Sequence, residues 1–158
     1  MSDADLSTPI DDLPRLEACL AQGSDVAVAS RAAAGANVEI HQPLYRESLG
    51  RAFNALVRAL LVPEIHDTQC GFKLFSGPAA EAVFRRARND GFAFDVEALF
   101  LARRLGYRVA EVPVTWRNDA ASRVSVLSGS LAFLDLARIR VDAWMGRYDV
   151  VRGPTPAP

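Results

Sequence analysis

The first candidates for chemistry in this sequence are two aspartates close to the N-terminus, Asp3 and Asp5. In extended backbone, side chains two residues apart face the same way, so both carboxylates would point to one place. Such a pair suits Mg²⁺ or Mn²⁺, which take oxygen ligands and often complete their coordination with substrate phosphates. A structural interpretation stays open beside this one, because acidic residues are also favoured near the beginning of a helix.

A second candidate is the polar segment that precedes a short apolar run. Asp67 and Gln69 come shortly before Gly71, whose lack of a side chain allows a tight turn or a close approach of the backbone to a ligand. Cys70 has no histidine or second cysteine beside it. We therefore expect Cys70 to be a buried structural thiol rather than a nucleophile.

A third candidate is a pair of acidic residues, Asp95 and Glu97, which follow the aromatic residues Phe92 and Phe94. The two acids could cap a helix and stabilise its first turn. Alternatively, the aromatic residues could frame one acid against a sugar. The sequence leaves both interpretations open.

A fourth candidate is a set of arginines. Guanidinium groups match the geometry of phosphate, although a single arginine is usually a solvated surface group, and the sequence cannot show whether several converge. The set comprises Arg31, Arg46, Arg51, Arg117 and Arg123, the last of which follows Ser122.

The charge is distributed unevenly along the chain. Residues 1–25 carry six acidic side chains and one arginine, whereas residues 101–147 carry eight arginines and four acidic side chains. This distribution fits a site that holds a cation on one side and anionic groups on the other, and it also fits ordinary variation of a protein surface.

Apolar periodicity predicts the elements that must position these residues. The first predicted helix begins at Thr8 and ends at Gly23, and the others span 48–61, Ser76 to about Arg88, 95–105 and 128–147. The predicted strands span 26–29, 72–75 and 107–114. The predicted loops span 32–47, 64–71 and 117–127. Helices that alternate with short apolar strands predict an α/β sandwich. We expect one unit over residues 1–148 and a Pro-rich, disordered tail at 149–158.

The composition excludes several classes of protein. Among 158 residues, 50% are hydrophobic and 23% charged, which excludes global disorder, and a net charge of -1 argues against a nucleic-acid-binding protein. The N-terminus lacks the features of a secretory signal, and no apolar run reaches the roughly 18–20 residues that span a bilayer. Two cysteines are too few for a disulfide scaffold, so we expect a reduced, cytoplasmic setting.

Taken together and in this order, the candidate segments resemble the family 2 glycosyltransferases of the GT-A fold. The most similar branch uses dolichyl or polyprenyl phosphate and includes β-glucosyltransferase-like proteins and the mannose synthases. The resemblance is carried by Asp3–Pro9, Ser30-Arg31, Phe53–Arg58, Asp67–Phe75, Gly91–Glu97, Glu111–Trp116 and Ser122-Arg123.

The resemblance implies a GT-A-like, Rossmann-like α/β/α sandwich and a role for each candidate residue. The implied metal ligands for Mg²⁺ or Mn²⁺ are Asp3, Asp5 and Ser7; the implied catalytic residues, which border the donor sugar and the acceptor, are Asp67 and Asp95; the implied substrate-binding residues are Arg31, Gln69, Arg117, Ser122 and Arg123. Serine at the position of Ser7 fits the glucosyl branch better than the mannosyl branch.

The implied reaction moves glucose or mannose from UDP-glucose or GDP-mannose to a polyprenyl phosphate, with inversion of the anomeric centre. The metal ion would neutralise the departing diphosphate. The acceptor phosphate is already ionised near neutral pH and needs no strong general base, so the two carboxylates would orient sugar hydroxyls. Because the acceptor is a lipid and helix 128–147 mixes apolar residues with arginines, we expect peripheral contact with the inner face of the cell membrane; the alternative is a helix that only packs on the sheet.

Members of this family begin with a nucleotide-binding half, which is missing before Asp3. The resemblance therefore implies a C-terminal portion of the GT-A domain, with little or no activity alone. Two other interpretations stay open. The chain could be a non-catalytic remnant that binds a membrane or a partner through helix 128–147, or a transferase whose acceptor is a sugar or a protein.

Overall fold

The computed structural model describes residues 1–2, 7–40, 44–117 and 126–149. All but the first residue of the predicted tail at 149–158 therefore lies outside the described residues. Within the described ranges, no helix is long and apolar enough to cross a membrane.

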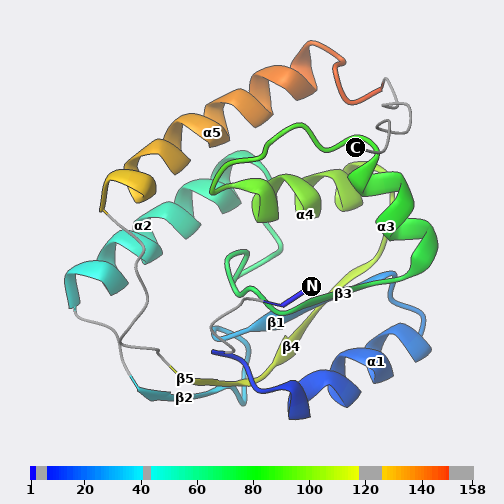
Figure 1. Cartoon of the computed structure of the whole chain (residues 1–158), viewed down its shortest axis with the longest axis vertical. Coiled ribbons are helices and arrows are strands. Elements are labelled where there is room, and N and C mark those ends of the chain that lie inside the picture. Colours follow the sequence, from blue (N-terminus) through cyan, green and yellow to red (C-terminus); the bar gives the residue numbers. More distant parts are fainter. Residues whose placement is uncertain (3–6, 41–43, 118–125, 150–158) are drawn as a thin grey trace, which may run out of the picture.

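The described strands form two small sheets. β1 (Val26–Ser30) is the central strand of the first sheet; β4 (Val109–Pro113) pairs with it in parallel and β3 (Lys73–Phe75) pairs antiparallel. β2 (Asn37–Ile40) and β5 (Thr115–Arg117) pair in parallel in the second sheet. Since β4 leads directly into β5, the second sheet extends from one edge of the first (Figure 1).

β1 is buried along its whole length, as its continuous apolar sequence predicts for a strand covered on both faces. Val26 and Val28 belong to the larger hydrophobic core on one face of the sheet. Ala27 and Ala29 alternate with them and belong to a smaller core on the other face, where they meet Leu16. The alternation of Cβ directions along a strand therefore divides one apolar run between two cores.

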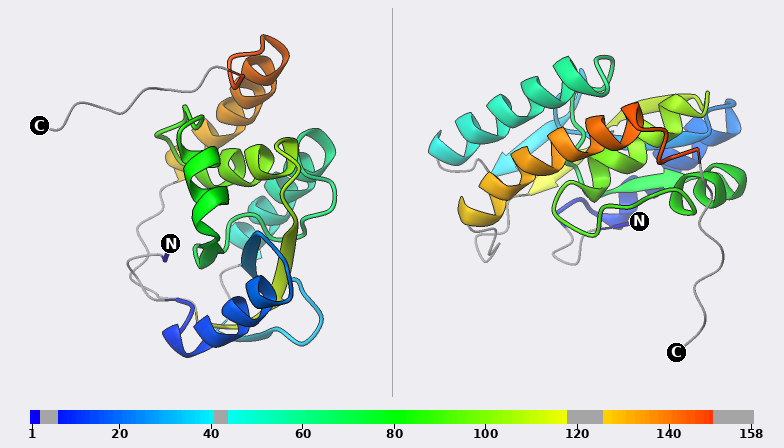
Figure 2. Two further views of the ribbon diagram at one scale, coloured as in Figure 1. Left: turned by 90° about the vertical axis from the view of Figure 1, so that its right-hand side faces the viewer. Right: turned by 90° about the horizontal axis from the view of Figure 1, so that it is seen from above.

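Helices cover both faces of the first sheet. A short 3₁₀ helix, η1 (Ile10–Asp12), leads into α1 (Leu13–Ala21), which packs on the face of the smaller core. The other four helices, α2 (Leu44–Leu60), α3 (Gly77–Phe84), α4 (Phe94–Arg104) and α5 (Val126–Trp144), lie on the opposite side. Figures 1 and 2 both place α5 farthest from the sheet, across α2 and α4. The chain is thus a mixed α/β structure with a small mixed sheet, as predicted, and it is consistent with a Rossmann-like fold.

Two of the predicted loops contain regular structure. Segment 32–47 holds β2 and the beginning of α2 at Leu44, and the predicted loop that began at residue 117 overlaps β5. These predictions were wrong because β2 and β5 stabilise each other across the chain: the main-chain N–H of Asn37 donates to the carbonyl oxygen of Val114 at 3.1 Å. Local periodicity carries no information about such a partner.

Three predicted helix boundaries also shift. Thr8 does not cap the first helix, because its hydroxyl lies 3.6 Å from the Sγ atom of Cys70 and the 3₁₀ turn begins at Ile10. The end predicted at Gly23 is confirmed by its φ of 99°, a left-handed conformation that glycine adopts without strain. The third helix ends at Phe84 instead of Arg88. The main-chain N–H of Arg88 donates to the side chain of Glu97 in α4 instead of to a helical carbonyl oxygen. α5 likewise ends at Trp144, before the predicted residue 147.

Candidate functional site

The candidate residues gather at one edge of the first sheet. Arg31 directly follows β1, and Lys73 begins β3, whose antiparallel direction brings its first residue to the edge where β1 ends. Asp67 lies in the loop between α2 and β3, and Asp95 lies in the first turn of α4. In α/β proteins, ligands bind outside the carboxyl ends of the parallel strands, and this edge is that end for β1 and β4.

Arg31 and Asp67 form a two-pronged ion pair. Nε of Arg31 donates to Oδ2 of Asp67 at 2.7 Å and Nη2 donates to Oδ1 at 2.8 Å, while the main-chain N–H of Arg31 adds a bond of 2.9 Å to Oδ2. The guanidinium also lies over the ring of Trp116, 5.1 Å from its centroid. Asp67 is buried, and both of its oxygens are engaged by Arg31.

Lys73 and Asp95 form a second buried ion pair. Nζ of Lys73 donates to Oδ2 of Asp95 at 2.8 Å and to the carbonyl oxygen of Cys70 at 2.6 Å. Oδ1 of Asp95 is buried and has no hydrogen-bond partner among the described residues, and the same is true of Oγ1 of Thr68. We call Arg31, Asp67, Lys73 and Asp95 the charged cluster. Because buried polar atoms are normally hydrogen-bonded, Oδ1 of Asp95 is a candidate acceptor for a ligand's donor group.

The loop that carries Asp67 is held from two sides. Glu111 on β4 accepts the main-chain N–H groups of His66 and Asp67, each at 3.0 Å, and lies 2.9 Å from Nδ1 of His66. From α2, the side-chain amide of Asn54 donates to the carbonyl oxygen of His66, and Arg58 donates to that of Pro63 at 3.2 Å. The segment Phe53–Arg58, noted in the sequence for its resemblance, therefore positions the Asp67 loop.

The electrostatics of the cluster follow from this geometry. Burial alone would raise the pKa of the Asp67 carboxyl, but the hydrogen bonds and charge of Arg31, aided by the charge of Lys73, hold that pKa below its ordinary value. Burial raises the pKa of the Cys70 thiol, and the nearby charge of Asp67 raises it further. Cys70 is thus a buried, protonated thiol, as predicted for a structural residue.

The lowered pKa of Asp67 predicts a loss of stability in acid. The unfolded carboxyl titrates near pH 3.9, so its ion pair contributes fully above that pH and is lost as the pH falls through the lower folded value. We expect the free energy of unfolding, measured by urea titration from pH 7 to pH 3, to fall toward acid in the parent chain. The Asp67→Asn variant, which cannot titrate there, should lose less over the same interval. Equal losses in both proteins would contradict this assignment.

The predicted metal ligands Asp3 and Asp5 lie outside the described residues, but the residues on either side of them are placed. The main chain of Met1 pairs with that of Lys73 through bonds of 2.9 and 3.0 Å. The carbonyl oxygen of Ser7, a buried residue, accepts the main-chain N–H of Arg117 at 2.9 Å. Within the described residues, no group of three or more acidic, histidine or cysteine side chains could hold a metal ion, so the metal site stays a prediction.

The predicted substrate-binding residues are only partly brought together. Arg31 belongs to the charged cluster, and Gln69 is half-buried in the Asp67 loop. Arg117 ends β5 with an exposed side chain. Ser122 and Arg123 lie outside the described residues. Whether these groups converge on one phosphate therefore stays a prediction.

Glu97 has a structural role. Its Oε2 accepts the main-chain N–H groups of Arg88 and Asn89, each at 2.9 Å, and its Oε1 accepts the hydroxyl of Tyr148 at 2.7 Å. Burial, and then this bond to Glu97, raise the pKa of Tyr148, so the phenol remains a donor. Both acids lie in the first turn of α4, as the structural alternative predicts, but neither caps the helix, because no side chain accepts at its N-cap, Ala93. Glu97 binds the main chain before α4, whereas Asp95 belongs to the charged cluster.

Sequence reasoning missed two members of the site, Lys73 and Glu111. Two features of the sequence pointed to Lys73: it is the only lysine among 18 basic residues, and it is the first residue of an otherwise apolar strand. Glu111 also interrupts an apolar strand, and a half-buried carboxylate in such a strand needs a hydrogen-bond donor as its partner. In both places, a charge within a strand was the available clue.

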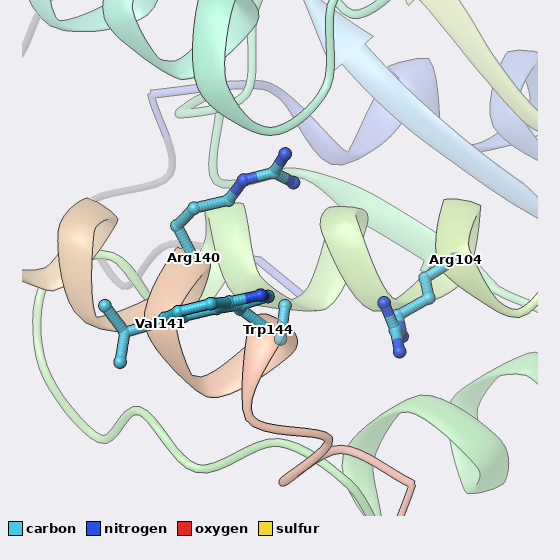
Figure 3. Close-up of a pocket in the computed structure, with 5 residues that line it drawn as sticks. Arg104, Arg140, Val141 and Trp144 are labelled. Carbon is cyan, nitrogen blue, oxygen red and sulfur yellow. The ribbon is translucent and has the colours of Figure 1, made fainter.

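The outer face of α5 carries exposed apolar side chains. Leu134 is 67% exposed and Trp144, the last residue of the helix, is 89% exposed; Met145, which follows the helix directly, is 58% exposed. Arg138 and Arg140 on the same helix are also exposed. Inward-facing residues of α5 belong to the core, so the helix packs against the protein and still presents an apolar surface. Beside Trp144 lies an open hollow of about 490 Å³, lined by Arg104, Arg140, Val141, Ala143 and Trp144 (Figure 3).

Comparison with known proteins extends these observations. No family model matches the chain. It is 38% identical over 106 residues to the dolichyl-phosphate beta-glucosyltransferase of Dictyostelium discoideum, covering 66% of this chain and 32% of that protein. It is 33% identical over 154 residues to that of Drosophila melanogaster, covering 90% and 47%, and 35% identical over 130 residues to that of Mus musculus, covering 78% and 40%.

The chain spans about a third to a half of the length of the curated relatives that it matches. The matches extend over two thirds or more of the chain itself in most cases, which is more than a single motif could produce. The resemblance inferred from the sequence is therefore confirmed: this chain belongs to the family of the dolichyl-phosphate glycosyltransferases.

Proposed function

We propose that this chain forms part of a GT-A glycosyltransferase of family 2 that moves glucose from UDP-glucose to dolichyl or polyprenyl phosphate, with inversion at C1. The similarity to proteins named dolichyl-phosphate beta-glucosyltransferase, over up to 90% of the chain, carries the proposal. Those names favour glucose over mannose, for which GDP-mannose would be the donor. Because the relatives are much longer than this chain, the proposal assigns no residue to recognition of the nucleotide base.

In the proposed reaction, an ionised oxygen of the acceptor phosphate attacks C1 of the sugar and the bond from C1 to the nucleoside diphosphate breaks. The charged cluster would act on the reactants through position rather than proton transfer. Asp95 keeps one carboxylate oxygen for a sugar hydroxyl. Asp67 gives both oxygens to Arg31, so its role is to aim the guanidinium toward an anionic group of donor or acceptor.

Asp3, Asp5 and Ser7 would hold Mg²⁺ or Mn²⁺ in this proposal. All three offer oxygen donors, the kind that these ions prefer. The fit is supported by Met1 and Ser7, whose main chains lie beside Lys73 and Arg117 at the same end of the molecule as the charged cluster. When bound, the ion would supply positive charge against the diphosphate.

A transfer assay tests the proposed function. A polypeptide of the relatives' full length that contains this chain is incubated with radiolabelled UDP-glucose, dolichyl phosphate and Mg²⁺. Label in the lipid extract is measured, with GDP-mannose as the competing donor. We expect glucolipid from the parent and from Glu81→Gln, a change at an exposed acid, and about 100-fold less from Asp95→Asn. Binding of UDP-glucose without any transfer would favour the non-catalytic alternative, and transfer to a soluble sugar or peptide would favour a different acceptor.

We further propose that the outer face of α5 rests on an anionic membrane surface. Leu134 and Val141 are seven residues apart and so share one side of α5. The exposed Trp144 ends the helix, and the exposed Met145 follows it directly. The arginines of α5 flank this side, as in helices that lie in the membrane interface with apolar side chains inserted and cationic side chains at the headgroups. The hollow beside Trp144 would place Arg104 and Arg140 against lipid phosphates.

This membrane proposal predicts that Trp144→Ser weakens binding to vesicles of phosphatidylglycerol and phosphatidylcholine. Loss of one inserted aromatic side chain, about 1.5–3 kcal/mol, corresponds to a loss of about tenfold or more in partitioning, measured by flotation. Phe84→Ser on α3, where the side chain is 45% exposed, is the matched control and should bind like the parent. Binding should also fall with added salt. Equal losses in both variants, or no loss in either, would contradict the assignment.

A further inference from the structure

We infer that Lys73 is a positioning residue for the proposed transfer: it holds Asp95 by one carboxylate oxygen so that the other remains for the ligand. The inference rests on the proposed function. It begins from the burial of the side chain of Lys73, which is 0% exposed. Removing an ammonium group from water is costly, and a buried ion pair is often no more stabilising than an apolar pair of similar volume. Stability alone therefore does not account for a lysine here.

The contacts of Lys73 join three segments of the candidate site. Its Nζ atom bonds Oδ2 of Asp95 at the beginning of α4 and the carbonyl oxygen of Cys70 in the Asp67 loop. Its main chain bonds Met1 in both directions, beside the segment that holds the two predicted metal ligands. One residue thus connects α4, the Asp67 loop and the first residue of the chain.

The effect on Asp95 is directional. With Oδ2 held by the ammonium group at 2.8 Å, the carboxylate cannot rotate freely, and Oδ1 has a fixed direction. Oδ1 is buried without a partner among the described residues, although a charged oxygen is a strong acceptor. A ligand hydroxyl that donates to Oδ1 would complete the hydrogen bonding of this carboxylate.

The chemistry of lysine suits this role better than that of arginine. A guanidinium presents a planar fork that engages both oxygens of a carboxylate, as Arg31 does with Asp67. An ammonium is a point charge and binds one oxygen of Asp95, which leaves the other available. The two ion pairs of the charged cluster therefore differ: in the first, both carboxylate oxygens accept from the arginine, and in the second, one oxygen can still accept a hydrogen bond from a ligand.

The test uses this chain within a polypeptide of the relatives' full length as the parent. It compares that parent with Lys73→Met, Lys73→Arg, Asp95→Asn and the double variant of Lys73→Met with Asp95→Asn. Arg85→Met removes an exposed ion pair and serves as the control. Carboxyl ¹³C NMR follows Asp95, whose signal is identified by its loss in Asp95→Asn, during titration with UDP-glucose and Mg²⁺. Urea unfolding shows which variants are folded at the assay temperature, and kcat and KM are measured for those that are.

We expect UDP-glucose to move the Asp95 signal in the parent and in the control, with at least tenfold weaker affinity in Lys73→Met. Lys73→Arg should fold better than Lys73→Met but recover neither binding nor kcat. Where transfer is measurable, kcat/KM should fall about 100-fold in each single variant and no further in the double variant, because both changes remove one unit.

The inference is overturned if UDP-glucose leaves the Asp95 signal unmoved in the parent, or if a folded Lys73→Met variant binds and reacts like the parent. It is also overturned if the losses in the double variant add. A parent that shows the binding effect but makes no glucolipid would refute the proposed function and leave the role of Lys73 in orienting Asp95 intact.

Discussion

Replacing Arg31 with methionine is expected to lower the free energy of unfolding by about 3–5 kcal/mol, because it leaves the buried carboxylate of Asp67 without its counter-charge. The reverse change should cost less. The side chain of Arg31 is 30% exposed, so its guanidinium can turn toward water in Asp67→Ala, and we expect a loss of about 1–3 kcal/mol. Urea titration at neutral pH measures both values.

Two further variants separate charge from geometry in this pair. Arg31→Lys keeps a positive charge but loses the fork, so its stability should lie between that of the parent and that of Arg31→Met. Arg15 has a side chain that is 49% exposed, and its guanidinium lies 3.2 Å from Asp12, so Arg15→Met should cost no more than about 1 kcal/mol. If Arg31→Met were as stable as Arg15→Met, the pair would have no special role in holding the loop of Asp67.

The second large effect is expected for Glu97→Ala, with a loss of about 3–5 kcal/mol in the free energy of unfolding. The change removes the hydrogen-bond acceptor of two main-chain N–H groups and of the Tyr148 hydroxyl. Each buried donor left without an acceptor costs about 1–3 kcal/mol. The main chain at Arg88 and Asn89 would lose its anchor to α4. Because that segment leads into the turn that carries Asp95, transfer should fall together with stability.

Partial variants test how this loss divides. Tyr148→Phe removes one hydrogen bond and should cost about 1 kcal/mol, whereas Glu97→Gln, which keeps an acceptor oxygen, should lie between it and Glu97→Ala. Glu81→Ala, at a side chain that is 65% exposed on α3, is the control and should change stability by less than about 0.5 kcal/mol. A small loss in Glu97→Ala would mean that water replaces the carboxylate.

The relation between the two ion pairs gives the site its asymmetry. Arg31 donates hydrogen bonds to both carboxylate oxygens of Asp67, and this pair is held in place beside Trp116. Lys73 binds only one carboxylate oxygen of Asp95, Oδ2. A ligand that brings a hydroxyl to the second pair and an anionic group to the first would match both, and a sugar phosphate has these two features.

Neighbouring residues were enough to predict the elements that depend on local pattern. The continuous apolar run of β1, the helical spacing of α2 and α4, and the glycine that follows α1 were all readable from neighbouring residues. The motifs around Asp67 and Asp95 were sufficient to identify the family, because type and order of residues carry that information. The apolar and cationic character of α5 was equally visible.

Which polar groups become partners depends on the folded chain. β2 exists because β5 lies beside it, and the beginning of the α3–α4 loop is set by Glu97 from the following helix. Lys73 lies 22 residues from Asp95 in the chain, and Arg31 lies 36 from Asp67. A hydrogen bond depends on distance and direction in space, and a buried charge selects whichever partner the fold brings within about 3 Å, a choice that local sequence does not encode.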